Sequence, residues 1–353
     1  VATAWMDASR GPGLALAVGA FTLIGVGVGA AGTSLLVLLA KQVAPERRAP
    51  AASLVWVMMI AGFVVTAGLA GHFLDPYTPL RLVAVSGTVC ALAFLLATVA
   101  VWGIERPADA PRGAGATGVP FRAALAQVWS ESQARRFTVF VFVSMLAFSA
   151  QDLILEPFAG LVFGLTPGQS TQLSAVQNSG VLLGMLVVGF AAAWRRGPRL
   201  GSLRAWTIGG CIASGLALAA LAIAGYVGPG WPLRPSVFAL GVANGAFSVA
   251  AIGSMMALVG AGRASREGVR MGLWGASQAI AFAAGGVLGT AAVDLMRLLL
   301  GSPLAAYSTV FALEAVAFIW AARLAARVGA IDGREPARPQ LATPQLAAET
   351  SSR

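Results

Sequence analysis

The sequence predicts an all-α, multi-pass membrane protein, and two observations carry this prediction. Hydrophobic residues make up 58% of the 353 residues and charged residues only 11%, whereas an ordinary soluble domain has about 25% charged residues. About nine apolar runs reach the roughly 20 residues that a helix needs to cross a bilayer. The runs lie at about 13–40, 51–74, 81–103, 137–163, 171–194, 205–227, 235–260, 269–296 and 303–327.

The basic residues distinguish the two sides of the membrane. All but four of the 24 Lys and Arg residues fall between alternate pairs of runs or in the C-terminal tail. The four exceptions are Arg10, Arg81, Arg234 and Arg297. The positive-inside rule therefore places the basic connections and the C-terminus in the cytoplasm. This topology accounts for the net charge of +10, so we expect no nucleic-acid partner.

The second and eighth runs resemble each other at a constant offset. Trp56 and Gly71 recur as Trp274 and Gly289. Two similar halves in one orientation are typical of parallel repeats about an axis along the membrane normal, as in the major facilitator superfamily. We therefore expect a major facilitator-type fold, of which this sequence holds the equivalents of helices 4–12 of twelve and lacks the first three.

The expected organisation follows from the long connection between the third and fourth runs. The parts are 1–103, the remainder of an N-terminal half with three membrane helices; 104–135, a cytoplasmic connection; 136–328, a C-terminal half with six membrane helices; and 329–353, a disordered cytoplasmic tail. Within the connection, Phe121, Leu125 and Trp129 have helical spacing. They predict a short helix that either lies on the inner membrane surface or serves as a solvated linker.

The fourth run carries the residues least expected in a membrane helix, which are Gln151, Asp152, Glu156 and Pro157. An ionised carboxylate at the bilayer centre costs about 2.5–3.5 kcal/mol on insertion scales, so each acid should face a partner, a polar interior or a cavity. Their spacing of four residues puts Asp152 and Glu156 on one helix face, and Pro157 removes a backbone donor beside them. This face is either a polar contact between helices or a surface that handles a ligand, a proton or a partner.

Two other residues are candidate binding groups. Glu314 lies in the middle of the last run, where it either forms a hydrogen bond between helices or marks a lipid-facing docking point for another membrane protein. His72 lies at the outer end of the second run. It is either an ordinary interfacial histidine or an axial ligand of a magnesium tetrapyrrole, because imidazole is a common metal ligand.

The residue inventory argues against an enzyme and against a metal site built from protein side chains. One histidine and two cysteines are too few for a catalytic triad, a disulfide framework or a His-based metal centre. The G-x-G-x-x-G pattern that starts at Gly27 lies inside an apolar run with no preceding strand, so it does not predict dinucleotide binding. Gly25, Gly29 and Gly32 instead share a helix face and predict a close helix contact.

Several segments resemble the PucC/LhaA family, also called the bacteriochlorophyll delivery family. They are TSLLVLLAK at 33–41, PERR at 45–48 with VWVMMI at 55–60, RRFTVFVFVSMLAFSAQDLILEPFAG at 135–160 and TPGQSTQL at 166–173. The resemblance covers nearly the whole chain except the tail. These segments are more specific than the glycine patterns shared by transporters in general.

The resemblance implies a facilitator-type protein of the inner or intracytoplasmic membrane of phototrophic bacteria. Such a protein would assist the assembly of light-harvesting antenna complexes by delivering or holding (bacterio)chlorophyll for newly inserted antenna polypeptides. The implied partners are antenna subunits, bacteriochlorophyll or the enzymes of its synthesis, and membrane lipid; the implied cofactor is transiently bound bacteriochlorophyll. The candidate pigment- or partner-binding residues are then Gln151, Asp152, Glu156, Pro157, His72 and Glu314.

A second class of function is a proton- or ion-coupled small-molecule transporter of the major facilitator superfamily. In that case Asp152 and Glu156 would be the coupling acids. No Lys or Arg lies in the middle of a run to pair with an anionic substrate. The large apolar body of a pigment instead suits an apolar, glycine-rich, lipid-accessible surface with few polar groups.

Overall fold

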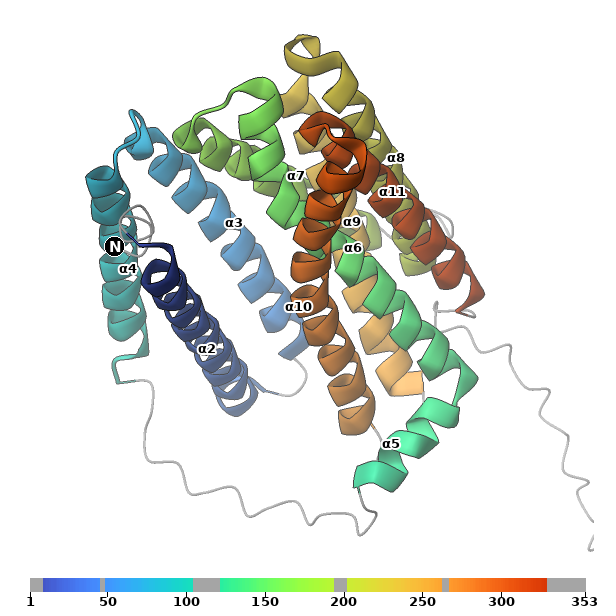
Figure 1. Cartoon of the computed structure of the whole chain (residues 1–353). Coiled ribbons are helices and arrows are strands. Elements are labelled where there is room, and N and C mark those ends of the chain that lie inside the picture. Colours follow the sequence, from blue (N-terminus) through green and yellow to red (C-terminus); the bar gives the residue numbers. More distant parts are fainter. Residues whose placement is uncertain (1–8, 45–47, 104–120, 194–201, 262–266, 329–353) are drawn as a thin grey trace, which may run out of the picture.

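The computed structural model describes residues 9–44, 48–103, 121–193, 202–261 and 267–328. Within these residues helices are the only regular secondary structure, and nine of them are long and apolar enough to cross a membrane. The predicted all-α, multi-pass fold is confirmed. The elements are α2 (Arg10–Gln42), α3 (Arg48–Leu74), α4 (Pro79–Val101), α5 (Phe121–Ser130), α6 (Ser132–Phe163), α7 (Pro167–Ala193), α8 (Leu203–Val227), the short 3-10 helix η2 (Gly228–Gly230), α9 (Leu233–Ala261), α10 (Glu267–Leu300) and α11 (Pro303–Arg327) (Figure 1).

The membrane helices match the predicted apolar runs but several continue beyond them. α6 begins at Ser132 and so includes Arg135 and Arg136, and α10 continues past Arg297 to Leu300. Long basic side chains can bury their stems while the charged group reaches the interface, so a helix need not end where its apolar run ends. The expected tail, 329–353, and the first part of the long connection, 104–120, lie outside the described residues.

The predicted short helix before the fourth run is present as α5 and is fixed to the helix bundle. Val128 of α5 is fully buried. Directly after the helix, Glu131 accepts hydrogen bonds from Arg270 of α10, the shortest at 2.8 Å, and the Arg270 side chain is only 2% exposed. A bidentate ion pair between a guanidinium and a carboxylate is among the stronger and more directional polar contacts. The connection therefore ends in a helix held against α6 and α10.

Helices α6 to α11 share one continuous core. α11 packs on α8 and α6, α10 on α6, and α9 on α7 and α8 (Figure 1). Phe158 of α6 meets Phe311 of α11 edge-on with ring centroids 5.0 Å apart, and Phe247 of α9 meets Phe318 of α11 similarly at 6.0 Å. Each such pair contributes about 0.5–1.5 kcal/mol beyond simple burial. One face of α11 is therefore central to the core.

Helices α7 and α9 cross through two facing glycine pairs that the sequence analysis did not single out. Gly180 and Gly184 of α7 lie against the backbone of α9, and Gly241 and Gly245 of α9 lie against the backbone of α7. A Cβ atom at any of the four would overlap a carbonyl oxygen of the other helix. Both pairs have the G-x-x-x-G spacing, which allows helix backbones to approach closely in lipid.

The repeated glycines of α3 and α10 both serve close approach, but to different neighbours. On α3, a Cβ at Gly71 would come within 2.7 Å of the Gly168 carbonyl oxygen and 2.8 Å of Gln172 of α7. On α10, a Cβ at Gly289 would come within 2.9 Å of Ala150 of α6. The repeated glycine thus serves close packing on both α3 and α10, and α3 is the helix that joins the first three described membrane helices to the rest.

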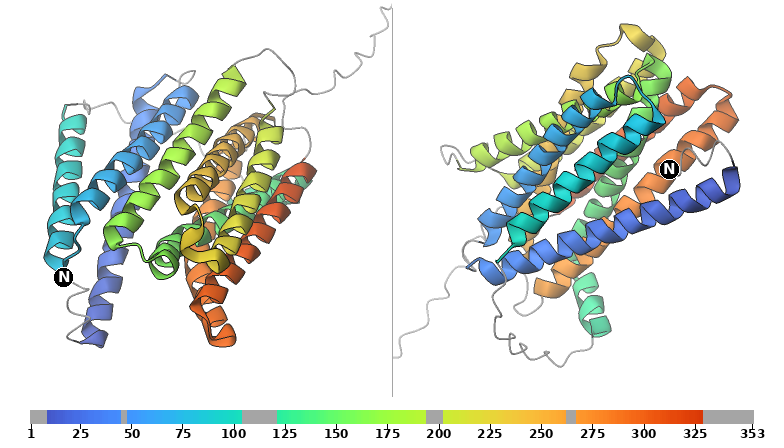
Figure 2. Two further views of the ribbon diagram at one scale, coloured as in Figure 1. Left: turned by 90° about the horizontal axis from the view of Figure 1, so that it is seen from above. Right: turned by 90° about the vertical axis from the view of Figure 1, so that its left-hand side faces the viewer.

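Helices α2 and α4 have few contacts with the other described helices. No residue of α4 is buried by the rest of the described chain, and Figure 2 shows both helices on the side of the bundle remote from α8 and α11. The close helix contact predicted at Gly25, Gly29 and Gly32 is not present in the described structure, where no atom lies within 4 Å of a Cβ placed at these glycines. Their shared face is exposed because no described helix packs on it.

Candidate functional site

The two acids of α6 form hydrogen bonds with polar side chains of α7. The Gln177 amide nitrogen lies 3.3 Å from Asp152 Oδ1 and donates to it, and one turn further along α6 the Ser174 hydroxyl donates to Glu156 Oε1 at 2.5 Å. Gln177 is buried, whereas both acids are exposed on the surface of the described structure. The predicted face exists, and it is a polar seam between α6 and α7 with one open side.

Each carboxylate of this seam has unused capacity to accept hydrogen bonds. An ionised carboxylate offers about four acceptor positions, and only one hydrogen bond to each acid is found in the described residues. Pro157 follows directly on Glu156 inside α6. Its missing N–H would otherwise bond the carbonyl of Leu153, so a backbone acceptor lies close to the two acids. The arrangement can therefore accept hydrogen bonds from a donor placed against its open side.

Gln151 and Glu314 are inside the protein and not on this open face. Gln151 is 1% exposed and Glu314 is 6% exposed, and the polar atoms of both side chains have no hydrogen-bond partner among the described residues. Glu314 lies on α11 between Phe311 and Phe318, whose rings pack into the core. The interpretation of Glu314 as a lipid-facing docking point is therefore wrong, because this side of α11 faces α6 and α9 and not lipid.

His72 lies in the last turn of α3 and lines a groove between α3 and α4. The groove has a volume of about 870 Å³, and its walls are largely apolar side chains such as Leu69, Val85 and Leu92. The imidazole meets Phe73 edge-on with ring centroids 5.4 Å apart, and no hydrogen bond to it is found in the described part of the chain. His72 and the seam of Asp152 and Glu156 are on different helix pairs and make up two separate candidate sites.

Comparison with known proteins decides the family. The model of the PUCC protein family matches residues 2–332. The chain belongs to the PucC family. A Rhodobacter capsulatus protein named "Bacteriochlorophyll synthase 44.5 kDa chain" is 52% identical over 333 residues, covering 94% of this chain and 76% of that protein. A "Protein PucC" of Rhodobacter capsulatus is 29% identical over 322 residues, covering 89% of this chain and 68% of that relative.

The PucC family members compared are longer than this chain. A third Rhodobacter capsulatus relative, described as an uncharacterised protein in the puhA-bchM intergenic region, is 31% identical over 300 residues, which cover 82% of this chain but only 60% of the relative. The chain thus spans between 60% and 76% of the length of these three proteins. The resemblance seen in the sequence to the PucC/LhaA family is confirmed.

One polar junction of this PucC family protein was missed by the sequence analysis. The Thr166 hydroxyl before α7 donates to the Asp75 carboxylate after α3, with the nearer oxygen at 2.8 Å. Thr166 and Gln169 also bond each other's backbone N–H groups through their side chains, at 3.1 and 3.2 Å, which is a capping box. The T-x-x-Q spacing could have revealed the cap. Nothing local in the sequence indicates that Asp75 is its third member.

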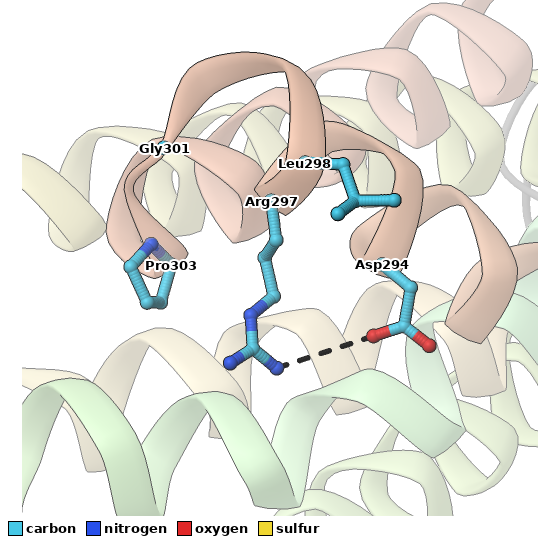
Figure 3. A pocket seen from close by; sticks show the side chains of 5 residues that line it. All are labelled: Asp294, Arg297, Leu298, Gly301 and Pro303. Carbon is cyan, nitrogen blue, oxygen red and sulfur yellow. Dashed lines mark ion pairs between the residues drawn. The ribbon is translucent and has the colours of Figure 1, made fainter.

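A smaller hollow of about 440 Å³ lies at the turn between α10 and α11. Figure 3 shows Arg297 reaching toward Asp294 across it, with an N–O distance of 4.0 Å. Both side chains are exposed, and an exposed pair at this distance contributes little to stability.

No group of three or more His, Cys, Asp and Glu side chains in the described residues could hold a metal ion. The seam and the groove are therefore the two sites of interest.

Proposed function

We propose that this protein is an assembly factor for light-harvesting antenna complexes, and that it holds bacteriochlorophyll or delivers it to newly inserted antenna polypeptides. The observation that carries the proposal is membership of the PucC family over 2–332 together with the 52% identity to a relative whose name refers to bacteriochlorophyll. We further propose antenna subunits and the enzymes of bacteriochlorophyll synthesis as partners. The proposed location is the bacterial inner membrane, with the C-terminus in the cytoplasm.

The surface chemistry of the described helices supports a pigment or another membrane helix as the ligand. Helices α2, α3 and α4 expose large apolar side chains along their length, among them Phe21, Phe63 and Phe94. A hydrogen bond between membrane helices contributes only about 0.6 kcal/mol on average. The polar seam could therefore orient a bound molecule, but its affinity would come mainly from van der Waals contact with apolar surfaces.

We propose that the pigment is bound without being chemically converted. The word "synthase" belongs to the name of a relative. In this chain Cys211 is buried and Cys90 is exposed. In the described residues, no hydrogen bond joins the single histidine to the acids of α6. General acid–base or nucleophilic catalysis needs such groups within hydrogen-bond reach of one another. The described residues offer a binding surface in place of that arrangement.

A transporter coupled to protons or ions is the second candidate, and one observation favours it. Asp152 and Glu156 lie on an open face of α6 with neutral partners only, Gln177 and Ser174. Acids inside membrane helices often mark a proton or ion pathway. A transporter would move a solute across the membrane at a rate that depends on a proton or ion gradient. The assembly factor would alter antenna content without such transport.

The decisive experiment combines a deletion strain with purification of the intact protein from phototrophically grown cells. We expect the deletion to lower the amount of assembled antenna, measured by near-infrared absorbance of membranes, and to leave pigment synthesis largely intact. We also expect gently purified protein to carry bacteriochlorophyll or antenna polypeptides. Normal antenna levels in the deletion strain, with a purified protein that carries neither and moves an unrelated solute, would refute the proposal in favour of the transporter.

A further inference from the structure

We infer that the groove between α3 and α4 is a binding site for a magnesium tetrapyrrole, with the His72 imidazole as the ligand of the magnesium ion. This inference rests on the proposed function and adds to it a location and a residue. The groove is lined by residues between Val65 and Phe73 in the C-terminal part of α3, by Asp75 in the turn that follows, and by residues of α4 between Arg81 and Leu96. Its volume of about 870 Å³ lies in the range of about 300–1,000 Å³ that is usual for small-molecule sites.

The groove is polar at one end and apolar along the rest of its length. His72, Asp75 and Arg81 gather at the end where α3 stops and α4 starts, while the α4 wall continues through Val89 and Leu92 to Leu96. The fifteen residue steps from Arg81 to Leu96 extend about 22 Å along a helix. A tetrapyrrole with an isoprenoid tail has a matching distribution, because its metal and carbonyl groups are at one end and its tail is entirely apolar.

Among the polar groups at this end, His72 is the one that the described structure leaves without a hydrogen bond. Asp75 accepts from Thr166, and Arg81 donates to the Pro76 carbonyl at 3.1 Å. The Thr88 hydroxyl further along α4 donates to the Ala84 carbonyl within its own helix. A neutral imidazole with a free ring nitrogen is a metal ligand. The unsatisfied group at the polar end is thus of the type that a magnesium tetrapyrrole requires.

A phospholipid would use the same groove differently. Its phosphate would depend on Arg81 and on the N-terminus of α4, which begins at Pro79, and it would make no use of the imidazole. Because Arg81 already has a backbone partner, the structure favours the occupant that needs His72. The dependence of binding on the metal and on the imidazole therefore separates the two occupants.

The test is a titration of the purified full chain in detergent with bacteriochlorophyll a and, separately, with its metal-free analogue bacteriopheophytin a. Variants are His72→Phe, which keeps a ring beside Phe73 but has no ligand nitrogen, and His72→Gly, to which free imidazole can be added. Tyr77→Phe is the matched control, because Tyr77 is exposed near the same end of α3 and does not line the groove. Binding is followed by absorbance, including the visible band that responds to the coordination number of magnesium.

We expect His72→Phe to weaken bacteriochlorophyll binding at least about tenfold, since even indirect disturbance of metal ligation has effects of roughly 10- to 100-fold. Binding of bacteriopheophytin should not change, and imidazole should restore the absorbance of the His72→Gly complex. Equal binding of bacteriochlorophyll by wild type and His72→Phe would overturn the inference while the proposed function stands. Phospholipid that co-purifies and is lost in Arg81→Ala, with no effect of His72, would also overturn it. A wild-type chain that binds neither pigment would refute the inference and the pigment-holding function together.

Discussion

At the scale of single residues, the polar groups of the membrane helices divide into those with partners and those without. Asp152 and Glu156 have a hydrogen bond each and an open side. Glu314 and Gln151 are enclosed, and their polar atoms lack partners in the described residues. Burying a polar group without a hydrogen bond is destabilising by about 1–3 kcal/mol in protein mutational data. The first two are therefore candidates for direct contact with a ligand, and the second two are candidates for stability effects.

The first prediction concerns the acids of the α6–α7 seam. Asp152→Asn and Glu156→Gln retain an oxygen that can accept from Gln177 and Ser174, so the packing of α6 on α7 should persist. We expect the free energy of unfolding to stay within roughly 0.5 kcal/mol of the wild-type value, as for substitutions that break no buried contact. The protein level in membranes should therefore stay near that of wild type, while antenna assembly is reduced. Immunoblots of membranes and near-infrared absorbance measure the two effects.

The matched control for the seam is Asp294→Asn, which removes an exposed acid of α10 whose ion pair with Arg297 spans 4.0 Å. This control should leave both protein level and antenna content unchanged. If Asp152→Asn and Glu156→Gln instead lower protein level and antenna content in the same proportion, the seam is a structural contact between helices.

The second prediction concerns Glu314. Because both carboxyl oxygens lack a hydrogen-bond partner in the described part of the chain, Glu314→Gln removes no described contact. We expect the thermal unfolding temperature of the purified protein to be unchanged or higher, and Glu314→Leu to behave in the same way. Loss of stability in both variants would show that the carboxyl group has a partner in the folded protein. Loss of antenna assembly at full stability would give Glu314 a functional role.

At the scale of elements, glycines and a capping threonine set the helix pairings. The α7–α9 crossing depends on Gly180, Gly184, Gly241 and Gly245, and the α3–α7 junction on Gly71 and the bond between Thr166 and Asp75. Where two backbones are in contact, an added methyl group has no free space and must move a whole helix. Small residues therefore control the geometry more than large apolar ones in these two crossings.

The third prediction tests the α7–α9 crossing with Gly184→Ala. Its Cβ would overlap the Val242 carbonyl oxygen, so α7 and α9 must separate. Overpacking of this kind is destabilising by about 1–3 kcal/mol. We expect a lower unfolding temperature in detergent and a lower steady-state level in membranes. Gly189→Ala on the same helix is the control, because a Cβ there meets no atom within 4 Å; equal effects of both variants would contradict the crossing.

At the scale of the whole molecule, composition and run length were sufficient to predict the class of fold and the number of spans, but not the rotation of each helix. Lipid is as apolar as the core, so a membrane helix has no difference in hydrophobicity between its lipid-facing and buried sides. The burial of Glu314 was therefore not predictable from the last run. The G-x-x-x-G spacing on α7 and α9 did mark buried faces, since small residues are informative where hydrophobicity is not.

The contacts between distant turns could not be predicted for a different reason. Asp75 and Thr166 are separated by α4, α5 and α6 in the chain, and no sequence pattern relates one to the other. The same holds for Gln177 and Asp152, which lie on successive helices but in a register that only the packing of α6 against α7 decides. Sequence identified the acids of the candidate site, and the structure identified their partners.

The last prediction is the topology. The turns after α3, α6, α8 and α10 lie together at the upper end of the bundle in Figure 1, so Pro167 and Pro232 share one side of the membrane. At the opposite end, Arg136 donates to the Arg327 carbonyl at 3.2 Å, and Arg204 donates to the Ala326 carbonyl. Arginines at the C-terminal end of a helix satisfy its free carbonyls and interact favourably with its dipole.

The basic residues of that end thus stabilise α11, and the positive-inside rule predicts from them the orientation of the chain in the membrane. We expect reporter fusions after Gly118 and after Arg338 to report the cytoplasm, and fusions near Pro167 and Pro232 to report the periplasm. The control for the Pro167 fusion is a fusion after Ser130, just before α6. It should report the cytoplasm, because α6 separates the two points. A periplasmic signal from Gly118 or Ser130 would reverse the orientation and would place the His72 groove at the cytoplasmic side.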